Sequence, residues 1–116
     1  MAGLRPVIFG NGKQSRDFTY VDDIVRGILL AAESDALVGQ AVNLARGQDV
    51  DITTLCHLIL KKLDRTDIEP LHLHEDRPAD IEKIQADVRK AKEVLGFVAE
   101  TDIDTGLDRY IDWIQS

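Results

Sequence analysis

Between residues 21 and 34, apolar side chains recur every three or four positions. They are Val21, Ile24, Val25, Ile28, Leu29 and Ala32. This spacing places them along one side of an α-helix. Asp22 and Asp23 follow the first of them, and acidic side chains in a first turn interact favourably with the positive end of the helix. We therefore expect an amphipathic helix here, and we interpret the two acids as first-turn residues in preference to ligand-groove residues.

Short strands and further helices are expected along the rest of the chain. Apolar or alternating runs bounded by turn residues predict strands at 7–9, 17–21, 41–45 and 71–74. Helical spacing and capping residues predict helices from 52 to about 63 with Asp51 as N-cap, from about 87 to 95 ended by Gly96, and from about 104 onward. The sequence thus predicts a small single domain over residues 1–116, of mixed α/β (α+β) class, with about four helices.

Length, charge and cysteine content narrow the classes of function. A chain of 116 residues can bury one core, and it has no apolar run approaching the roughly 18 residues of a membrane span. A net charge of −7 argues against nucleic acid or an anionic membrane as partner. The first residues lack the apolar run of a secretory signal, and Cys56 is alone, so we expect a cytoplasmic setting without disulfides.

Dinucleotide binding of the Rossmann type has no counterpart in the sequence. Such a site needs a strand, a GxGxxG-like turn and a helix whose N-terminus receives the pyrophosphate. The one GxG is Gly10-Asn11-Gly12, and neither a third glycine nor a helix start follows it. We predict a turn at this position, no Rossmann domain and no cofactor bound by this chain.

Two histidines and the cysteine were weighed as chemical groups. His72 and His74 project to the same side of a predicted strand, as metal ligands can, but polar cover of an exposed face is the simpler interpretation. Cys56 lies on the apolar side of the second predicted helix, where a structural thiol is more common than a nucleophile. We therefore predict neither a metal site nor a catalytic cysteine.

The order of motifs along the chain resembles a known family. Residues 7–23 have the sequence VIFGNGKQSRDFTYVDD, and the later motifs are Val42-Asn43-Leu44, Arg77-Pro78-Ala79-Asp80, Lys90-Ala91, Leu95-Gly96-Phe97 and Gly106-Leu107. This pattern is similar to the C-terminal, substrate-binding part of extended short-chain dehydrogenases of the nucleotide-sugar epimerase and dehydratase kind, such as UDP-glucose 4-epimerase. The resemblance covers nearly the whole chain.

The resemblance implies roles for five residues. Arg16 and Arg77 would hold the diphosphate of a nucleotide sugar from two sides, because a guanidinium pairs with phosphate oxygens in two-point fashion. Asp80 would accept a hydrogen bond from the nucleoside ribose, although Ala79 stands where the family usually has glycine. Tyr20 and Asn43 are further candidate substrate contacts.

The resemblance also implies what the chain lacks. The full-length family uses NAD or NADP and a catalytic tyrosine followed four residues later by a lysine, whereas Tyr20 and Tyr110 are each followed at that spacing by isoleucine. No catalytic residue is therefore predicted, and any nucleotide sugar should bind weakly to the isolated chain. Three alternatives stay open: a fragment of such an enzyme, a non-catalytic module that binds nucleotide sugars or forms a homo-oligomer, and a subunit that completes an enzyme in trans. The sequence does not choose between an epimerase, a dehydratase and a reductase.

Overall fold

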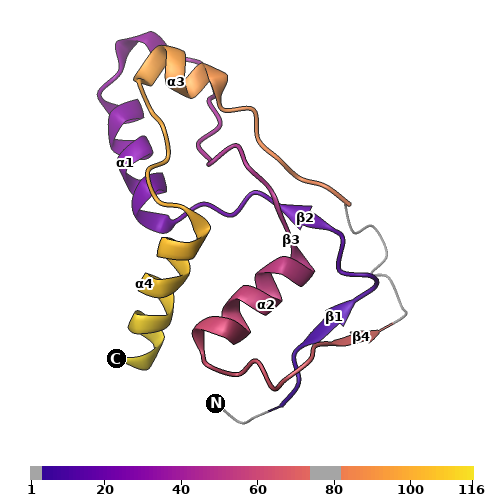
Figure 1. The fold of residues 1–116 in the computed structure, drawn as a ribbon. Coiled ribbons are helices and arrows are strands. Elements are labelled where there is room, and N and C mark those ends of the chain that lie inside the picture. Colours follow the sequence, from indigo (N-terminus) through magenta and orange to yellow (C-terminus); the bar gives the residue numbers. More distant parts are fainter. Residues whose placement is uncertain (1–3, 74–81) are drawn as a thin grey trace. The chain divides into compact units, whose positions relative to one another are not determined.

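A computed structural model describes residues 4–73 and 82–116 (Figure 1). The chain divides into two compact units, each made of two separate stretches. Unit 1 comprises residues 1–16 and 49–84, and unit 2 comprises residues 17–48 and 85–116. Four α-helices and four short strands in the described residues confirm the predicted mixed α/β class. That residues 1–116 form a single domain stays a prediction.

Unit 1 contains two two-stranded ladders. Strand β1 (Val7–Phe9) pairs in parallel with β4 (Leu71–Leu73), and β2 (Ser15–Arg16) pairs antiparallel with β3 (Val50–Asp51). Between β1 and β2 the chain turns at Gly10 and Gly12, both of which have a φ of 74°. Glycine is needed at position 12 for a second reason, because a Cβ there would lie 1.9 Å from the Thr53 hydroxyl oxygen. The predicted turn is confirmed.

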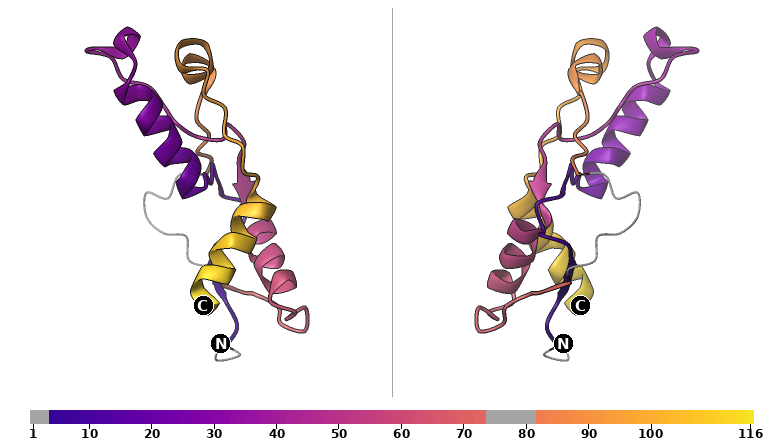
Figure 2. Two further views of the ribbon diagram at one scale, coloured as in Figure 1. Left: turned by 90° about the vertical axis from the view of Figure 1, so that its left-hand side faces the viewer. Right: turned by 90° about the vertical axis from the view of Figure 1, so that its right-hand side faces the viewer.

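Helix α2 (Ile52–Lys62) continues directly from β3 (Figure 2). Its first turn is capped as predicted, because the Asp51 carboxylate accepts a hydrogen bond from the Thr54 backbone N–H at 2.6 Å. The aliphatic side of α2 and β1 line a cavity of about 470 Å³, whose wall includes Ile8, Cys56 and Ile59. Among the described residues of this unit, the aliphatic side chains of Ile8 and Leu60 are buried.

Unit 2 is helical. It holds α1 (Val21–Ala32), a 3-10 turn η1 (Asp35–Leu37), α3 (Arg89–Leu95) and α4 (Ile103–Gln115). As expected, Gly96 ends α3 in the left-handed conformation, with a φ of 64°. Phe97 is fully buried, and a Cβ on Gly27 would lie 3.1 Å from its ring. Gly27 therefore lets α1 approach the core of unit 2 closely.

Helix α1 turns its most apolar side outward. An amphipathic helix normally buries its apolar stripe. Here the buried residues are Asp23 and Gly27, whereas Val21 and Leu29 are 61% and 60% exposed. The helix predicted from the spacing is confirmed, but its orientation within unit 2 is the reverse of the usual one.

Two predicted strands are wrong. Residues 17–20 are irregular. In place of a ladder, the Asp17 carboxylate accepts from the backbone N–H groups of residues 47 and 86, and the Tyr20 carbonyl accepts from the first turn of α1. Within the described part of the chain, residues 41–45 pair with no strand, and the Ala41 carbonyl accepts instead from the Lys90 ammonium at 2.7 Å. An apolar run becomes a strand only beside a partner that completes its ladder.

None of the described helices is both long and apolar enough to cross a bilayer.

Candidate functional site

Arg16 lies in β2 of unit 1, a strand with bonded neighbours on both sides. Its neighbour Ser15 is buried and donates its hydroxyl to the Asp49 carboxylate at 2.5 Å. Ser15 also donates its backbone N–H to Glu82 and accepts through its carbonyl from Ile84, while β3 pairs on the other side. Half-buried Arg16 itself donates from Nη1 to the Ser15 carbonyl at 2.7 Å. The backbone that carries this guanidinium is therefore fixed on both edges.

The charge of Asp49 fits this arrangement. The Ser15 hydroxyl lowers the pKa of the Asp49 carboxyl, against the opposing effect of burial, and the nearby Lys83 ammonium lowers it further. The Lys83 Nζ atom lies 3.8 Å from the Asp49 carboxylate. Asp49 is thus an ionised acceptor at neutral pH, and it holds Ser15 in place beside Arg16.

Arg77, Asp80 and His74 lie outside the described residues. The chain on either side of them is well bonded. The Leu73 carbonyl accepts from the Gly10 N–H at 2.7 Å, and the Glu82 carbonyl accepts from the Ser15 N–H at 2.7 Å. Both flanks of residues 74–81 are therefore attached to residues 10–15, directly before Arg16.

Tyr20 belongs to unit 2, where it precedes the first residue of α1. Its half-buried ring lies 5.4 Å from the Arg109 guanidinium, measured to the ring centroid. A Cβ on Gly106 would contact the ring at 3.5 Å, so this glycine lets α4 lie against it. The ring forms part of a groove of about 580 Å³ whose lining is largely aromatic and aliphatic: Phe18, Thr19, Tyr20, Val21, Leu107, Arg109, Tyr110 and Trp113. Tyr20 is thus placed as an apolar wall residue.

Asn43 is exposed and lies in an irregular segment of unit 2, not in the predicted strand. It lines a polar hollow of about 410 Å³ together with residues of α3 and the Asp87 carboxylate. The Arg89 side chain donates three hydrogen bonds to Asp87 and lowers the pKa of that carboxyl to about 2. Tyr20 and Asn43 line different hollows of this unit.

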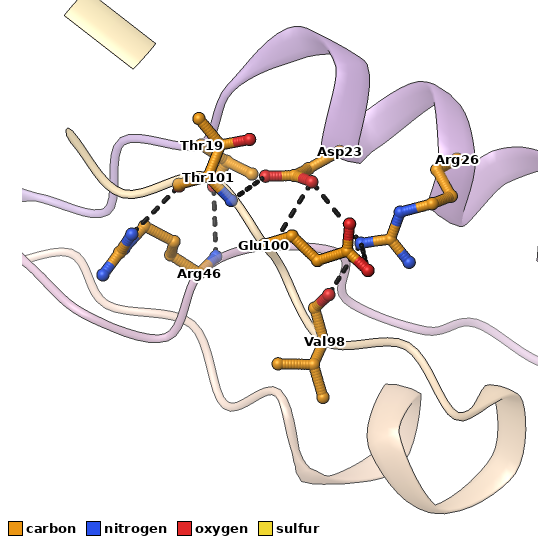
Figure 3. Close-up of polar contacts among 7 residues, drawn as sticks. All are labelled: Thr19, Asp23, Arg26, Arg46, Val98, Glu100 and Thr101. Carbon is orange, nitrogen blue, oxygen red and sulfur yellow. Dashed lines mark hydrogen bonds and ion pairs between the residues drawn. The ribbon is translucent and has the colours of Figure 1, made fainter. Parts of the chain in front are cut away.

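A network around Asp23 joins α1 to the segment before α4 (Figure 3). The sequence pattern predicted only a first-turn acid at this position. Asp23 is 4% exposed, and its carboxylate accepts from the backbone N–H groups of Glu100 and Thr101 at 3.2 and 3.0 Å. Burial raises the pKa of Asp23, but these two bonds and the Arg26 side chain outweigh it and leave the pKa below its ordinary value of 3.8. Asp23 is therefore a buried, ionised anchor.

Two arginines extend this network. Arg26 donates to the Val98 carbonyl at 2.6 Å and lies over the Phe97 ring at 4.9 Å. Arg46 donates its side chain to the Thr101 carbonyl at 2.9 Å and its backbone N–H to the Thr19 hydroxyl at 3.2 Å, as Figure 3 shows. The segments leading into α1 and α4 are thus both held by Arg46.

His72 and Cys56 lie in surroundings that do not favour metal binding or nucleophilic chemistry. His72 is exposed, and its Nδ1 lies 3.2 Å from the Gly10 carbonyl oxygen, within hydrogen-bond distance. Burial raises the pKa of the Cys56 thiol, and the Glu69 carboxylate raises it further, so the reactive thiolate is disfavoured. Residues 4–73 and 82–116 contain no group of three or more His, Cys, Asp or Glu side chains that could hold a metal ion. What the described residues offer is binding chemistry: a guanidinium on a fixed strand and an aromatic groove.

Comparisons with known proteins agree on one group of enzymes. Residues 1–110 match the family model described as GDP-mannose 4,6 dehydratase. The chain is 40% identical over 111 residues to a UDP-glucuronate 4-epimerase of Thermodesulfobacterium geofontis, covering 91% of this chain and 32% of that protein. It is 30% identical to a putative UDP-glucose 4-epimerase of Methanocaldococcus jannaschii, covering 96% and 34%.

Solved structures show the same relationship. The UDP-glucose 4-epimerase of Thermotoga maritima, solved with UDP-glucose, superposes with a TM-score of 0.86 at 33% identity, over 97% of this chain and 35% of that chain. The epimerase Mth375 of Methanothermobacter thermautotrophicus superposes with a TM-score of 0.89 at 25% identity, over 96% and 33%. This chain thus spans about a third of the length of the relatives that it matches.

Proposed function

Because the chain belongs to the GDP-mannose 4,6-dehydratase family of nucleotide-sugar epimerases and dehydratases, we propose that it is the nucleotide-sugar-binding portion of such an enzyme. In this proposal the chain binds neither NAD nor NADP and is not catalytic alone. The hydride chemistry belongs to a cofactor-binding part of the kind that an epimerase of Bacillus cereus, solved with NAD, contains. The single cysteine supports a reducing compartment such as the cytoplasm as its setting.

The fixed position of Arg16 is the observation that carries the proposal. A diphosphate needs permanently charged donors that do not have to be ordered on binding. Arg16 stands on a strand bonded on both edges. Arg77 and Asp80 belong to residues 74–81, and the residues on either side of that segment, Leu73 and Glu82, are hydrogen-bonded to residues 10–15. This attachment supports the joint assignment of Arg16 and Arg77 to the diphosphate and of Asp80 to the ribose. Tyr20 and Asn43 are proposed as further substrate contacts.

A ligand titration followed by backbone amide chemical shifts tests the proposal. UDP, GDP, dTDP and their sugars are added to the chain, with NAD as the control. We expect shifts at Arg16, Arg77 and Asp80 with one class of nucleotide diphosphate and none with NAD. Unchanged shifts at millimolar ligand would show that this chain does not bind nucleotide sugars.

Substitution of Arg16 separates charge from geometry. Arg16→Lys keeps the positive charge but loses the planar two-point donor, so we expect affinity to fall by about tenfold. Arg65→Lys is the matched control, because Arg65 is another arginine of unit 1 and is not proposed to contact the ligand; its side chain pairs with Asp67. Equal affinities for the two variants would remove Arg16 from the site.

A non-catalytic assembly module, or a subunit acting in trans, is the second candidate function. The outward-facing stripe of α1 favours it, since a large exposed apolar surface commonly marks an interface. Light scattering of the isolated chain distinguishes the module from a portion of an enzyme, because a stable homo-oligomer favours the module and a monomer favours the portion of an enzyme. A subunit acting in trans should instead restore NAD-linked turnover when its cofactor-binding partner is added.

A further inference from the structure

Three polar side chains of unit 1 meet next to Arg16. Ser15 is buried, at 7% exposure, and its hydroxyl donates to the Asp49 carboxylate at 2.5 Å. The Lys83 Nζ atom lies 3.8 Å from the same carboxylate, and the Lys83 backbone forms a parallel bridge with Ser15. We call Ser15, Asp49 and Lys83 the back-face cluster.

The back-face cluster lies behind the strand that carries the guanidinium. Side chains alternate between the two faces of a strand. Ser15 and Arg16 are successive residues of β2, so the Arg16 side chain leaves the ladder on the face opposite to the Ser15 hydroxyl. Arg16 pairs with Val50, and Asp49 directly precedes Val50. Asp49 therefore holds the ladder from the face opposite to the guanidinium.

The carbonyl group of Ser15 connects the cluster to the guanidinium. This carbonyl accepts from Arg16 Nη1 at 2.7 Å and from the Ile84 N–H at 3.1 Å. Its direction is set by the same residue whose hydroxyl Asp49 holds, so a rotation of Ser15 would move the acceptor to which the guanidinium is bound. The position of the Arg16 side chain thus depends on Asp49 through Ser15.

The two contacts of Asp49 differ in strength. A hydrogen bond to an ionised carboxylate is about twice as strong as one between neutral groups, and the hydroxyl of Ser15 makes this bond at 2.5 Å in a buried place. The Lys83 side chain is 61% exposed, and an exposed ion pair contributes little. Asp49 and Ser15 therefore form the effective part of the cluster.

We propose that Asp49 is a positioning residue for diphosphate binding, which acts through Ser15 to place the Arg16 guanidinium before the ligand arrives. This deepens the proposed function and rests on it. An acid beside a site for a polyanion is unfavourable by charge alone, in a chain whose net charge is already −7. Ordering a long side chain in advance offsets that cost, because less freedom is lost on binding.

Replacement of the acid gives opposite signs for charge and for positioning. UDP is the probe, because relatives of this chain are UDP-sugar enzymes by name. Asp49→Ala removes a negative charge, so charge alone predicts tighter binding of UDP, whereas positioning predicts an affinity about fivefold lower. Asp49→Asn keeps an acceptor for the Ser15 hydroxyl and should recover most of the loss. In the Arg16→Lys background the effect of Asp49→Ala should fall below about twofold, since both changes act through one guanidinium.

Asp67→Ala is the matched control. It removes another acid of unit 1, one whose carboxylate pairs with Arg65, so it makes the same change in net charge. We expect its affinity for UDP to equal that of the wild-type chain or to exceed it slightly.

A measurement without ligand tests the positioning itself. The Nε–Hε group of Arg16 is followed by nitrogen-15 relaxation and by its exchange with water. We expect an ordered group in the wild-type chain and in Asp49→Asn, and a mobile, rapidly exchanging group in Asp49→Ala. Ser15→Ala should have the same effect as Asp49→Ala while it keeps the charge of Asp49, and it serves as the second variant if Asp49→Ala does not fold. Chemical denaturation shows which variants are folded.

Two results would overturn the proposal. One is an Arg16 Nε–Hε group that is as ordered in Asp49→Ala and Ser15→Ala as in the wild-type chain. The other is an affinity for UDP that rises or stays unchanged in Asp49→Ala while Arg16→Lys loses it. If the wild-type chain binds UDP no better than uridine, the proposed function fails instead, and the measurement without ligand still decides whether Asp49 places the Arg16 side chain.

Discussion

Units 1 and 2 hold their distant segments together by different means. In unit 1 the main contacts run from backbone to backbone: β1 pairs with β4, β2 pairs with β3, and the Thr53 N–H donates to the Gly12 carbonyl at 3.1 Å. In unit 2 side chains capture backbone groups instead. Asp23 binds the N–H groups of residues 100 and 101, and Asp17 binds those of residues 47 and 86.

This difference has a physical consequence. A ladder depends on backbone conformation and is insensitive to most side-chain changes, so unit 1 should be vulnerable at its glycines. A carboxylate that accepts from two distant N–H groups concentrates several bonds in one residue, so unit 2 should be vulnerable at single acids. The following predictions test that contrast.

Asp23→Ala should cause the largest loss. It removes three hydrogen bonds that a buried carboxylate accepts and leaves two backbone N–H groups without that partner. We therefore expect the free energy of unfolding to fall by about 3 kcal/mol. Chemical denaturation measures the loss, and amide exchange should accelerate at residues 100 and 101. Asp22→Ala, at the exposed neighbouring position, should have almost no effect. A similar loss in both variants would contradict the anchor role.

Gly12→Ala should be the most damaging change in unit 1. The new methyl group would approach the Thr53 hydroxyl, and the backbone would keep a φ of 74°, so we expect a loss of about 2 kcal/mol. Gly39→Ala is the control, because Gly39 has the same φ and open space around it. Its smaller loss gives the cost of conformation alone. If the two losses are equal, the packing against Thr53 contributes nothing.

The two helix N-caps provide the same chemistry in both units. Asp51 accepts from Thr54 in unit 1 and Asp102 from Thr105 in unit 2, so replacing either by alanine should cost about 1 kcal/mol. Asparagine, which keeps the acceptor, should restore most of it. One cooperative transition in which both losses add would support the predicted single domain, whereas losses in separate transitions would refute it.

Lowering the pH should destabilise unit 2, with the smallest effect of these predictions. Since the folded pKa of Asp23 is below its ordinary value of 3.8, its stabilisation is complete above that value and is lost as the pH falls through the folded pKa. The amide shifts of Glu100 and Thr101 should therefore change only at strongly acidic pH. Asp23→Asn should abolish this change. A transition near neutral pH would mean that another group controls the network.

Local sequence signals predicted the helices well. A few neighbouring residues determine each of these signals: the N-cap formed by Asp51, the left-handed Gly96 and the apolar spacing from Val21 to Ala32. The strand predicted at 41–45 failed because strand formation depends on a distant partner that a local pattern does not specify.

The site was only partly predictable. Arg16 is proposed as a site residue from its motif alone, and the bonds that hold its strand involve Asp49 and Glu82, which are far away in sequence. Asp23 was missed, although one signal was present: it stands four residues before Gly27 and off the apolar stripe, on the side that the structure buries. The destination of its two backbone bonds, at residues 100 and 101, has no local signal at all.

The half-buried Cys56 has a practical consequence. It is the only cysteine and belongs to unit 1, whereas the only tryptophan belongs to unit 2. Because burial and a raised pKa suppress the thiolate, thiol-labelling reagents should modify Cys56 mainly during transient openings of unit 1. The labelling rate of Cys56 therefore reports on the opening of unit 1, and the tryptophan fluorescence reports on the opening of unit 2. Both rates can be measured in the unaltered protein without an engineered probe.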